Sequence, residues 1–153
     1  MLPSFEEYCR LIASQSDRFP SIRFSTLTAY TIGPFAAEVE GQLAFEADYV
    51  LDVWELLDLS TRTIRSYSYE LNCAGERVWW YDPTEHPEDP TLSSSYPHHK
   101  HIPPDIKHHR IPAPELSFTR PNLPVLIEEV ERLIAEQGAV GQVTDSLPGE
   151  NRQ

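Results

Sequence analysis

The chain has 153 residues, 40% of them hydrophobic, and a formal net charge of −12. This length and composition fit one globular domain and exclude a fibrous or wholly disordered chain. No apolar run approaches the ~20 residues of a membrane-spanning helix, and the first residues lack the apolar core of a signal peptide. The cysteines form no CxxC pair and indicate no disulfide framework. We therefore expect a cytoplasmic protein that does not insert into a membrane.

The charge is spread unevenly along the chain. Residues 38–58 hold seven acids and no lysine or arginine, whereas residues 96–110 hold five histidines and three other basic residues against one aspartate. The acidic stretch could face a basic partner, and the histidine-rich stretch could meet an anion. A solubilising surface with a chance cluster of histidines is the alternative interpretation.

The predicted elements form an α+β fold. Ser4-Phe5-Glu6-Glu7 is typical of a capping box and predicts an N-terminal helix over residues 4–17. A C-terminal helix is predicted from Asn122 to about residue 137, because its apolar residues recur at helical spacing. Between the helices, alternation and β-branched content predict five strands, over residues 22–30, 35–46, 49–57, 63–71 and 77–81. Their short connections favour a mainly antiparallel sheet.

The composition changes after Asp82, since ten of the 14 prolines lie between Pro83 and Pro124. Proline lacks an N–H donor and fixes φ, so we expect residues 83–121 to form a long loop over the sheet. Loops of this length often carry function. We thus predict a single domain over residues 1–137 and a flexible tail over residues 138–153.

The strand predicted over residues 49–57 contains an unusual acid. With a period of two, Glu55 shares its face with the apolar Val53 and Leu57. Burial of an unpaired carboxylate raises its pKa, which suits a general acid or base. Two structural interpretations remain open: Glu55 pairs with Arg62 or Arg65, or the opposite face of the strand is the buried one.

The next strand reads Arg65-Ser66-Tyr67-Ser68-Tyr69. Alternation predicts that Arg65, Tyr67 and Tyr69 share one face. A guanidinium beside two phenols can hold a phosphate or stack on a base. Ordinary packing of tyrosines within a sheet is the alternative.

A segment at residues 97–104, Pro-His-His-Lys-His-Ile-Pro-Pro, is the strongest local signal. Its flanking prolines favour an extended backbone. On such a backbone His99 and His101 point to one side, and His98 and Lys100 to the other.

Three interpretations of this segment compete. A metal site could use His99 and His101 with His86 or Asp82, although the chain has no HExxH motif. An acid–base site could use one histidine as the acid and another group as the base, with Lys100 on a phosphate. A histidine-rich surface loop without chemistry is the third.

The ordered set of these motifs resembles the TumE family of bacterial and archaeal toxin–antitoxin systems. The similarity covers about residues 45–101 and rests on Leu51-Asp52-Val53-Trp54-Glu55, Tyr67-Ser68-Tyr69, Tyr81-Asp82, His86-Pro87 and Pro97-His98-His99-Lys100-His101. The resemblance implies a toxin that inhibits growth and a small antitoxin with a helix-turn-helix domain, encoded beside it. It also implies action on RNA, in the manner of RelE-like messenger-RNA interferases.

The main hypothesis is therefore a metal-independent endoribonuclease that needs no cofactor. Its expected catalytic residues are Glu55, Tyr69, His98, His99, Lys100 and His101. Its expected substrate-binding residues are Arg65, Tyr67, Trp80, Asp82 and His86. We expect Glu55, Tyr69 and the histidine segment to converge in one cleft. A non-catalytic protein-binding module and a metal hydrolase built on the histidine cluster are the alternatives, and self-association of the chain is left open.

Overall fold

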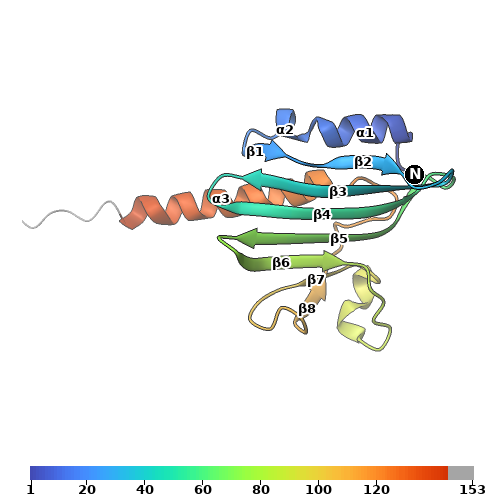
Figure 1. The fold of residues 1–153 in the computed structure, drawn as a ribbon. Coiled ribbons are helices and arrows are strands. Elements are labelled where there is room, and N and C mark those ends of the chain that lie inside the picture. The colour runs from blue at the N-terminus through green and yellow to red at the C-terminus, as the bar shows by residue number, and fades with distance from the viewer. Residues whose placement is uncertain (145–153) are drawn as a thin grey trace, which may run out of the picture.

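The computed structural model describes residues 1–144, whose elements are shown in Figure 1. The predicted capping box is present, because the Ser4 hydroxyl accepts from the Glu7 N–H and the Glu7 carboxylate accepts from the Ser4 N–H. Helix α1 (Phe5–Ala13) follows this cap, and a second short helix, α2 (Gln15–Arg18), begins after Ser14. The N-terminal helix is thus two pieces rather than one.

An antiparallel sheet forms the body of the protein. It contains β1 (Ile22–Ser25), β2 (Thr28–Thr31), β3 (Ala36–Phe45), β4 (Tyr49–Asp58), β5 (Thr63–Cys73), β6 (Glu76–Asp82), β7 (His99–His101) and β8 (Arg110–Pro112). The spatial order is β1-β3-β4-β5-β6-β7-β8, and β2 also pairs with β3. A 3-10 helix, η1 (Pro90–Ser95), precedes β7, and α3 (Leu123–Thr144) follows β8. The predicted α+β class with a mainly antiparallel sheet is confirmed.

The predicted number of strands was five, and the sheet has eight. The first predicted strand divides into β1 and β2, which pair with different parts of β3. The predicted loop over residues 83–121 contributes β7 and β8 to the edge of the sheet. The prolines allow this because β7 is a proline-free triplet, and Pro112 lies on the edge strand, where a missing N–H is tolerated.

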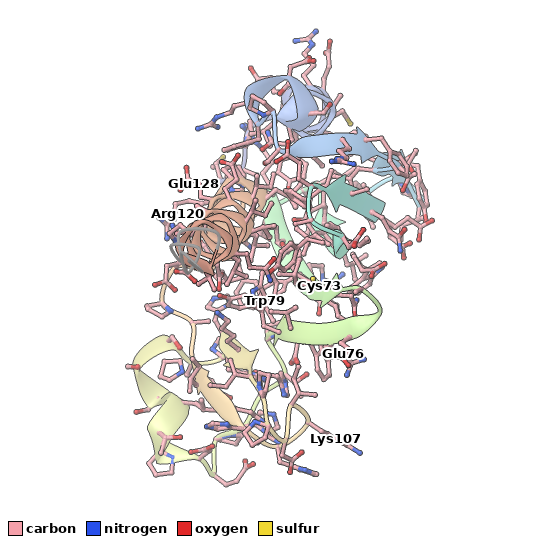
Figure 2. All side chains as sticks on the ribbon, turned by 90° about the vertical axis from the view of Figure 1, so that its left-hand side faces the viewer. Cys73, Glu76, Trp79, Lys107, Arg120 and Glu128 are labelled. Atoms are coloured by element: carbon pink, nitrogen blue, oxygen red, sulfur yellow. The ribbon has the colours of Figure 1, made fainter. Side chains whose placement is uncertain are left out.

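The sheet has two different faces. On the helix face, Tyr8 of α1 donates to Glu55 of β4, and Tyr81 of β6 donates to Glu129 of α3. Both helices therefore contact this face, and Figure 2 shows α3 nearly end-on beside the sheet. Strand β4 alternates strictly between buried and half-buried residues, so its apolar set forms core under the helices. We call the opposite side, which carries Trp54, the outer face.

Helix α3 continues to Thr144, so residues 138–144 are helical where a flexible tail was predicted. Glycine within a helix costs only about 1 kcal/mol relative to alanine, which the remaining turns can outweigh. The rest of the predicted tail, residues 145–153, lies outside the described residues. Over the part of the chain that the structure describes, no helix is long and apolar enough to cross a membrane.

Candidate functional site

Glu55 lies in the core between the sheet and the helices. Its side chain is 0% exposed. Tyr8 and Tyr69 each donate a hydrogen bond of 2.6 Å to its two oxygens, and Asn122 in turn donates to the Tyr69 hydroxyl. Burial raises the pKa of Glu55, and the two hydroxyl donors only partly oppose that rise. The carboxylate is thus satisfied by phenols, and not by Arg62 or Arg65 as one interpretation held.

His98 belongs to the helix face as well. Its Nδ1 lies 2.6 Å from the Tyr67 hydroxyl, and its ring packs against Phe118 at 4.6 Å between centroids. Tyr67 also stacks on Tyr69 at 4.8 Å. A continuous row of side chains therefore joins His98 to Glu55, and burial lowers the pKa of His98.

Lys100 points to the same side of β7 as His98. It pairs with Glu129 of α3 and lies 5.2 Å from the ring centre of Tyr81. Both members of the pair are less than one-fifth exposed, at 18% and 17%. The structure therefore places Lys100 under α3, where it supports the helix and does not meet His99 or His101.

Arg65 does not share a face with the tyrosines. Leu56 pairs with Ser66 and Leu57 with Ile64, so Arg65 is the extra residue of a β-bulge. Its side chain is exposed. The prediction of a common face is wrong because it assumed an unbroken period of two.

His99 and His101 point to the outer face, where they meet Asp82. Strand β7 lies beside β6 with His99 opposite Asp82 and His101 opposite Trp80. The Nε2 atoms of the two histidines are 3.1 Å apart. The Asp82 oxygens lie 3.3 Å from His99 Nε2 and 2.9 Å from His101 Nε2. All three residues are buried, at 1%, 4% and 5% exposure for His99, His101 and Asp82.

The predicted convergence in a single cleft is consequently wrong. The alternation predicted for residues 98–101 is confirmed, and it divides the segment between the two faces. Glu55, Tyr69, His98 and Lys100 lie on the helix face, whereas the Asp82–His99–His101 cluster lies on the outer face. Figure 2 shows Trp79, a helix-face residue, beside α3 and Lys107 projecting from the opposite side of the molecule.

Charge coupling within the Asp82–His99–His101 cluster is strong. Burial alone would raise the pKa of Asp82, but the two imidazoles hold it well below its ordinary value. Burial alone would lower the pKa of His99, but the Asp82 carboxylate raises it. Trp80 stacks on His101 at 4.2 Å with an interplanar angle of 14°, which fixes the orientation of that ring. These three residues could hold a metal ion, since one ligand atom from each lies within 4.8 Å of the others.

A pocket of about 430 Å³ opens over the Asp82–His99–His101 cluster on the outer face. Three permanent cations line it, Arg77, Lys107 and Arg110, and Asp82 is the one carboxylate in the lining; Arg77 is also paired with Glu70 at 2.9 Å. The remaining lining residues are Trp80, Thr84, His86, His101 and His108. We call this hollow the cationic pocket. A cationic pocket in a chain of net charge −12 is suited to a phosphate-bearing ligand.

Sequence reasoning missed the pocket's arginines as functional residues. Arg110 Nε is a buried donor with no hydrogen-bond partner among the described residues, and Arg110 pairs with His101 across β7 and β8. The excess of basic residues over residues 96–110 was a usable signal for it. No local signal in the sequence marked Arg77, because a bulge at Val78, which the sequence does not indicate, turns Arg77 to the outer face of β6.

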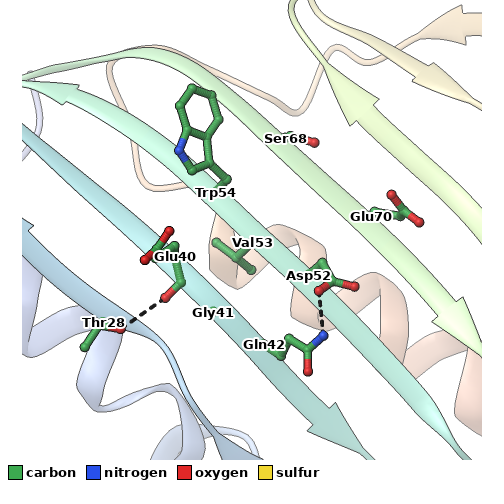
Figure 3. Close-up of a pocket in the computed structure, with 9 residues that line it drawn as sticks. All are labelled: Thr28, Glu40, Gly41, Gln42, Asp52, Val53, Trp54, Ser68 and Glu70. Atoms are coloured by element: carbon green, nitrogen blue, oxygen red, sulfur yellow. Dashed lines mark hydrogen bonds between the residues drawn. The ribbon is translucent and has the colours of Figure 1, made fainter.

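A second hollow on the outer face, over β3–β5, has the opposite charge. Figure 3 shows Glu40, Asp52 and Glu70 around Trp54, and α3 lies behind the sheet. Asp52 accepts a hydrogen bond of 2.7 Å from Gln42. We call this hollow the acidic groove. Its carboxylates repel phosphate, so of the two hollows the cationic pocket is the candidate for a phosphate-bearing ligand.

The fold and the two hollows define a small α+β protein with a histidine-containing cationic pocket at one edge of its sheet. The model of the family described as "Toxin TumE" matches residues 10–134, and the chain belongs to this toxin family. Searches of curated proteins and of solved structures give no match. The family makes the chain the toxin of a toxin–antitoxin system, which has an antitoxin as its partner.

Proposed function

We propose that this toxin is an endoribonuclease whose active site is the cationic pocket. The observation that carries the proposal is the position of three permanent cations around the Asp82–His99–His101 cluster in a strongly acidic chain. Positive charges at fixed positions bind phosphate oxygens and stabilise the charge that develops on them during cleavage. Inhibition of growth follows if the substrate is cellular RNA.

The reaction needs only groups that the RNA and the pocket supply. The ribose 2′-oxygen attacks the phosphorus, the bond from phosphorus to the 5′-oxygen breaks, and a 2′,3′-cyclic phosphate remains. One group takes the 2′ proton and another returns a proton to the 5′-oxygen. His101 lines the pocket and is the candidate for proton transfer when no metal is bound, and Arg110, which lines it as well, would hold the phosphate.

The roles first expected for several residues do not carry over. Glu55 and Tyr69 are enclosed in the core, and Lys100 is paired with Glu129. His101 remains as a catalytic candidate that lines the pocket, with Trp80 and His86 as substrate-binding candidates, whereas His99 is buried and does not line the pocket. The His101 ring stacks on Trp80, and the Arg77 guanidinium also lies over the Trp80 ring, 5.7 Å from its centre, so a base would stack on Trp80 only by taking the place of Arg77.

A metal-dependent phosphodiesterase is the second candidate. One observation favours it over the metal-independent enzyme first expected: the Nε2 atoms of His99 and His101 lie 3.1 Å apart, at 3.3 and 2.9 Å from the two Asp82 oxygens.

Induced expression in bacteria tests the proposal directly. We expect growth arrest and an accumulation of cellular RNA fragments with 5′-hydroxyl ends for the wild type. Arg110→Gln should relieve the arrest, whereas Arg65→Gln, an exposed arginine outside the pocket, should not. Growth arrest without new RNA ends would contradict the proposal and leave a non-catalytic binding toxin.

We further infer that the antitoxin carries a helix-turn-helix domain and binds the acidic groove through a basic segment. Support comes from the family resemblance and from the opposite charge of the groove. Co-expression with the neighbouring gene's product and co-purification test this. Glu40→Lys should release the partner, and Asp17→Lys, an exposed acid on α2, should not. If both variants released the antitoxin equally, or if neither released it, the acidic groove would not be its binding site.

A further inference from the structure

We propose that Asp82, His99 and His101 form a binding site for one divalent transition-metal ion of the Zn²⁺ or Co²⁺ kind. The inference deepens the proposed function, on which the use of the metal rests, but the binding itself can be measured without RNA.

The hydrogen bonds of the two imidazoles fix which nitrogen is free. His99 Nδ1 lies 3.1 Å from the Pro97 carbonyl oxygen, and His101 Nδ1 lies 2.8 Å from that of Ile106. A carbonyl oxygen can only accept, so each Nδ1 carries the hydrogen. Each Nε2 of a neutral ring is then a lone pair, and both lone pairs point into the same small space. This is how metal-binding histidines are oriented in proteins.

A cation must therefore occupy or neutralise that space. The two Nε2 lone pairs lie 3.1 Å apart, and the Asp82 oxygens lie 2.9 and 3.3 Å from them. These groups repel one another unless a cation lies between them. A proton on one Nε2 leaves the second lone pair facing the carboxylate, and a proton on each Nε2 places two imidazolium charges 3.1 Å apart against a single carboxylate. A metal ion at the common point satisfies His99, His101 and Asp82 together.

The spacing of the atoms fits a tetrahedral ion. Ligands about 2.0–2.1 Å from zinc at tetrahedral angles lie roughly 3.3 Å from one another. The two Nε2 atoms are 3.1 Å apart, and each lies near a different Asp82 oxygen, His99 Nε2 at 3.3 Å from Oδ1 and His101 Nε2 at 2.9 Å from Oδ2. Two imidazoles with one carboxylate favour a transition metal over Mg²⁺, which prefers oxygen ligands.

The surroundings hold these ligands in place. The Thr84 N–H donates to Asp82 Oδ1 at 2.8 Å, and Trp80 covers the His101 ring. The strands supply the pattern: a His-x-His triplet on β7 puts both rings on one side, and the register with β6 puts Asp82 opposite His99. Such partners commonly change metal affinity 10–100-fold when they are removed.

An open position remains on the pocket side. Asp82 and His101 both line the cationic pocket, together with Arg110. Three protein ligands and one open position are typical of catalytic rather than structural metal sites. A phosphate oxygen of RNA held by Arg110 could occupy the open position, where the metal would draw electron density from phosphorus.

Metal binding to the untagged full-length protein tests the inference. After treatment with a chelator, the protein is titrated with Zn²⁺ by calorimetry and with Co²⁺ by visible absorption. We expect one ion per chain and the absorption of four-coordinate cobalt. His101→Ala and Asp82→Asn should each weaken binding at least ~10-fold, whereas His109→Ala, an exposed histidine outside the pocket, should not change it. Asp82→Asn keeps the shape of the side chain, and urea unfolding of each variant verifies that it folds.

The outcomes separate the site from the function. Absence of stoichiometric binding by the wild type, or equal affinity of the folded His101→Ala and Asp82→Asn variants, overturns the site. Stoichiometric binding without RNA cleavage supports the site and overturns the ribonuclease. Full cleavage by chelator-treated protein overturns the catalytic use of the metal and leaves the ribonuclease in place, and the titration alone then decides the binding site.

Discussion

Replacing Glu55 separates a structural carboxylate from a catalytic one. In Glu55→Ala, the Tyr8 hydroxyl loses its hydrogen-bond acceptor, and so does the O–H of Tyr69. A buried unsatisfied polar group costs about 1–3 kcal/mol, and the lost side chain leaves a cavity, so we expect a total loss of about 3–5 kcal/mol. This is a large part of the 5–15 kcal/mol by which a domain is usually stable. The free energy of unfolding in urea measures it.

The isosteric variant gives the decisive comparison. Glu55→Gln keeps one acceptor and adds a donor, so it should lose less than half of what Glu55→Ala loses and should remain toxic on induced expression. A variant that unfolds at the wild-type urea concentration but no longer arrests growth would refute the structural assignment and return Glu55 to the chemistry.

The pH dependence of stability adds a second test of the same residue. Glu55 titrates near 4.3 in an unfolded chain, and burial raises its pKa in the folded protein. The protonated form is therefore favoured by folding. The stability from Glu55 is fully present below pH of about 4.3 and is lost as the pH rises through the folded pKa. As the pH rises through the folded pKa, the free energy of unfolding of the wild type should therefore fall relative to that of Glu55→Gln. A difference between the two proteins that stays constant with pH would contradict the raised pKa.

Three further substitutions probe the pocket, the helix face and the sheet. Arg110→Gln should raise the KM for RNA and reduce the salt dependence of binding, whereas the exposed Arg65→Gln should change neither; equal effects would refute the pocket. Lys100→Met should cost about 1–3 kcal/mol of unfolding free energy, because the half-buried Glu129 loses its cation and keeps only the hydrogen bond from Tyr81, and it should not lower the cleavage rate of the folded protein. A loss of cleavage without a loss of stability would instead indicate that Lys100 binds the phosphate. Gly41→Ala should lower the unfolding midpoint in urea, because Gly41 has φ +136° and a Cβ would lie 2.5 Å from a backbone oxygen between β1 and β2. An unchanged midpoint would show that this connection yields easily.

Local patterns in the sequence predicted most elements of the fold. The capping box at Ser4 and the alternation of β4 are local signals, and both elements are where they were expected. The additional strands were not predictable in this way. Strand β7 is three residues long and exists because β6 offers it an edge, which is a contact between distant parts of the chain.

The candidate site was predictable only in part. The alternation of His99 and His101 followed from the prolines around them, and Asp82 was already one of the candidate residues. The error was to group every motif in a single cleft. A resemblance orders residues along the chain and carries no information about which face of the sheet each occupies. The bulges at Arg65 and Val78 also shift the period of two, and nothing local in the sequence marks them.

Cleavage of a labelled single-stranded RNA by the purified protein tests the central claim most directly. The rates to compare are those of the wild type, His101→Ala and Glu55→Gln, each verified to be folded. If the cationic pocket is the active site, the wild type should cleave the RNA and Glu55→Gln should cleave it at a rate within about twofold of the wild type. His101→Ala should cleave it at least ~100-fold more slowly. An inactive Glu55→Gln beside an active His101→Ala would contradict this assignment and place the chemistry on the helix face.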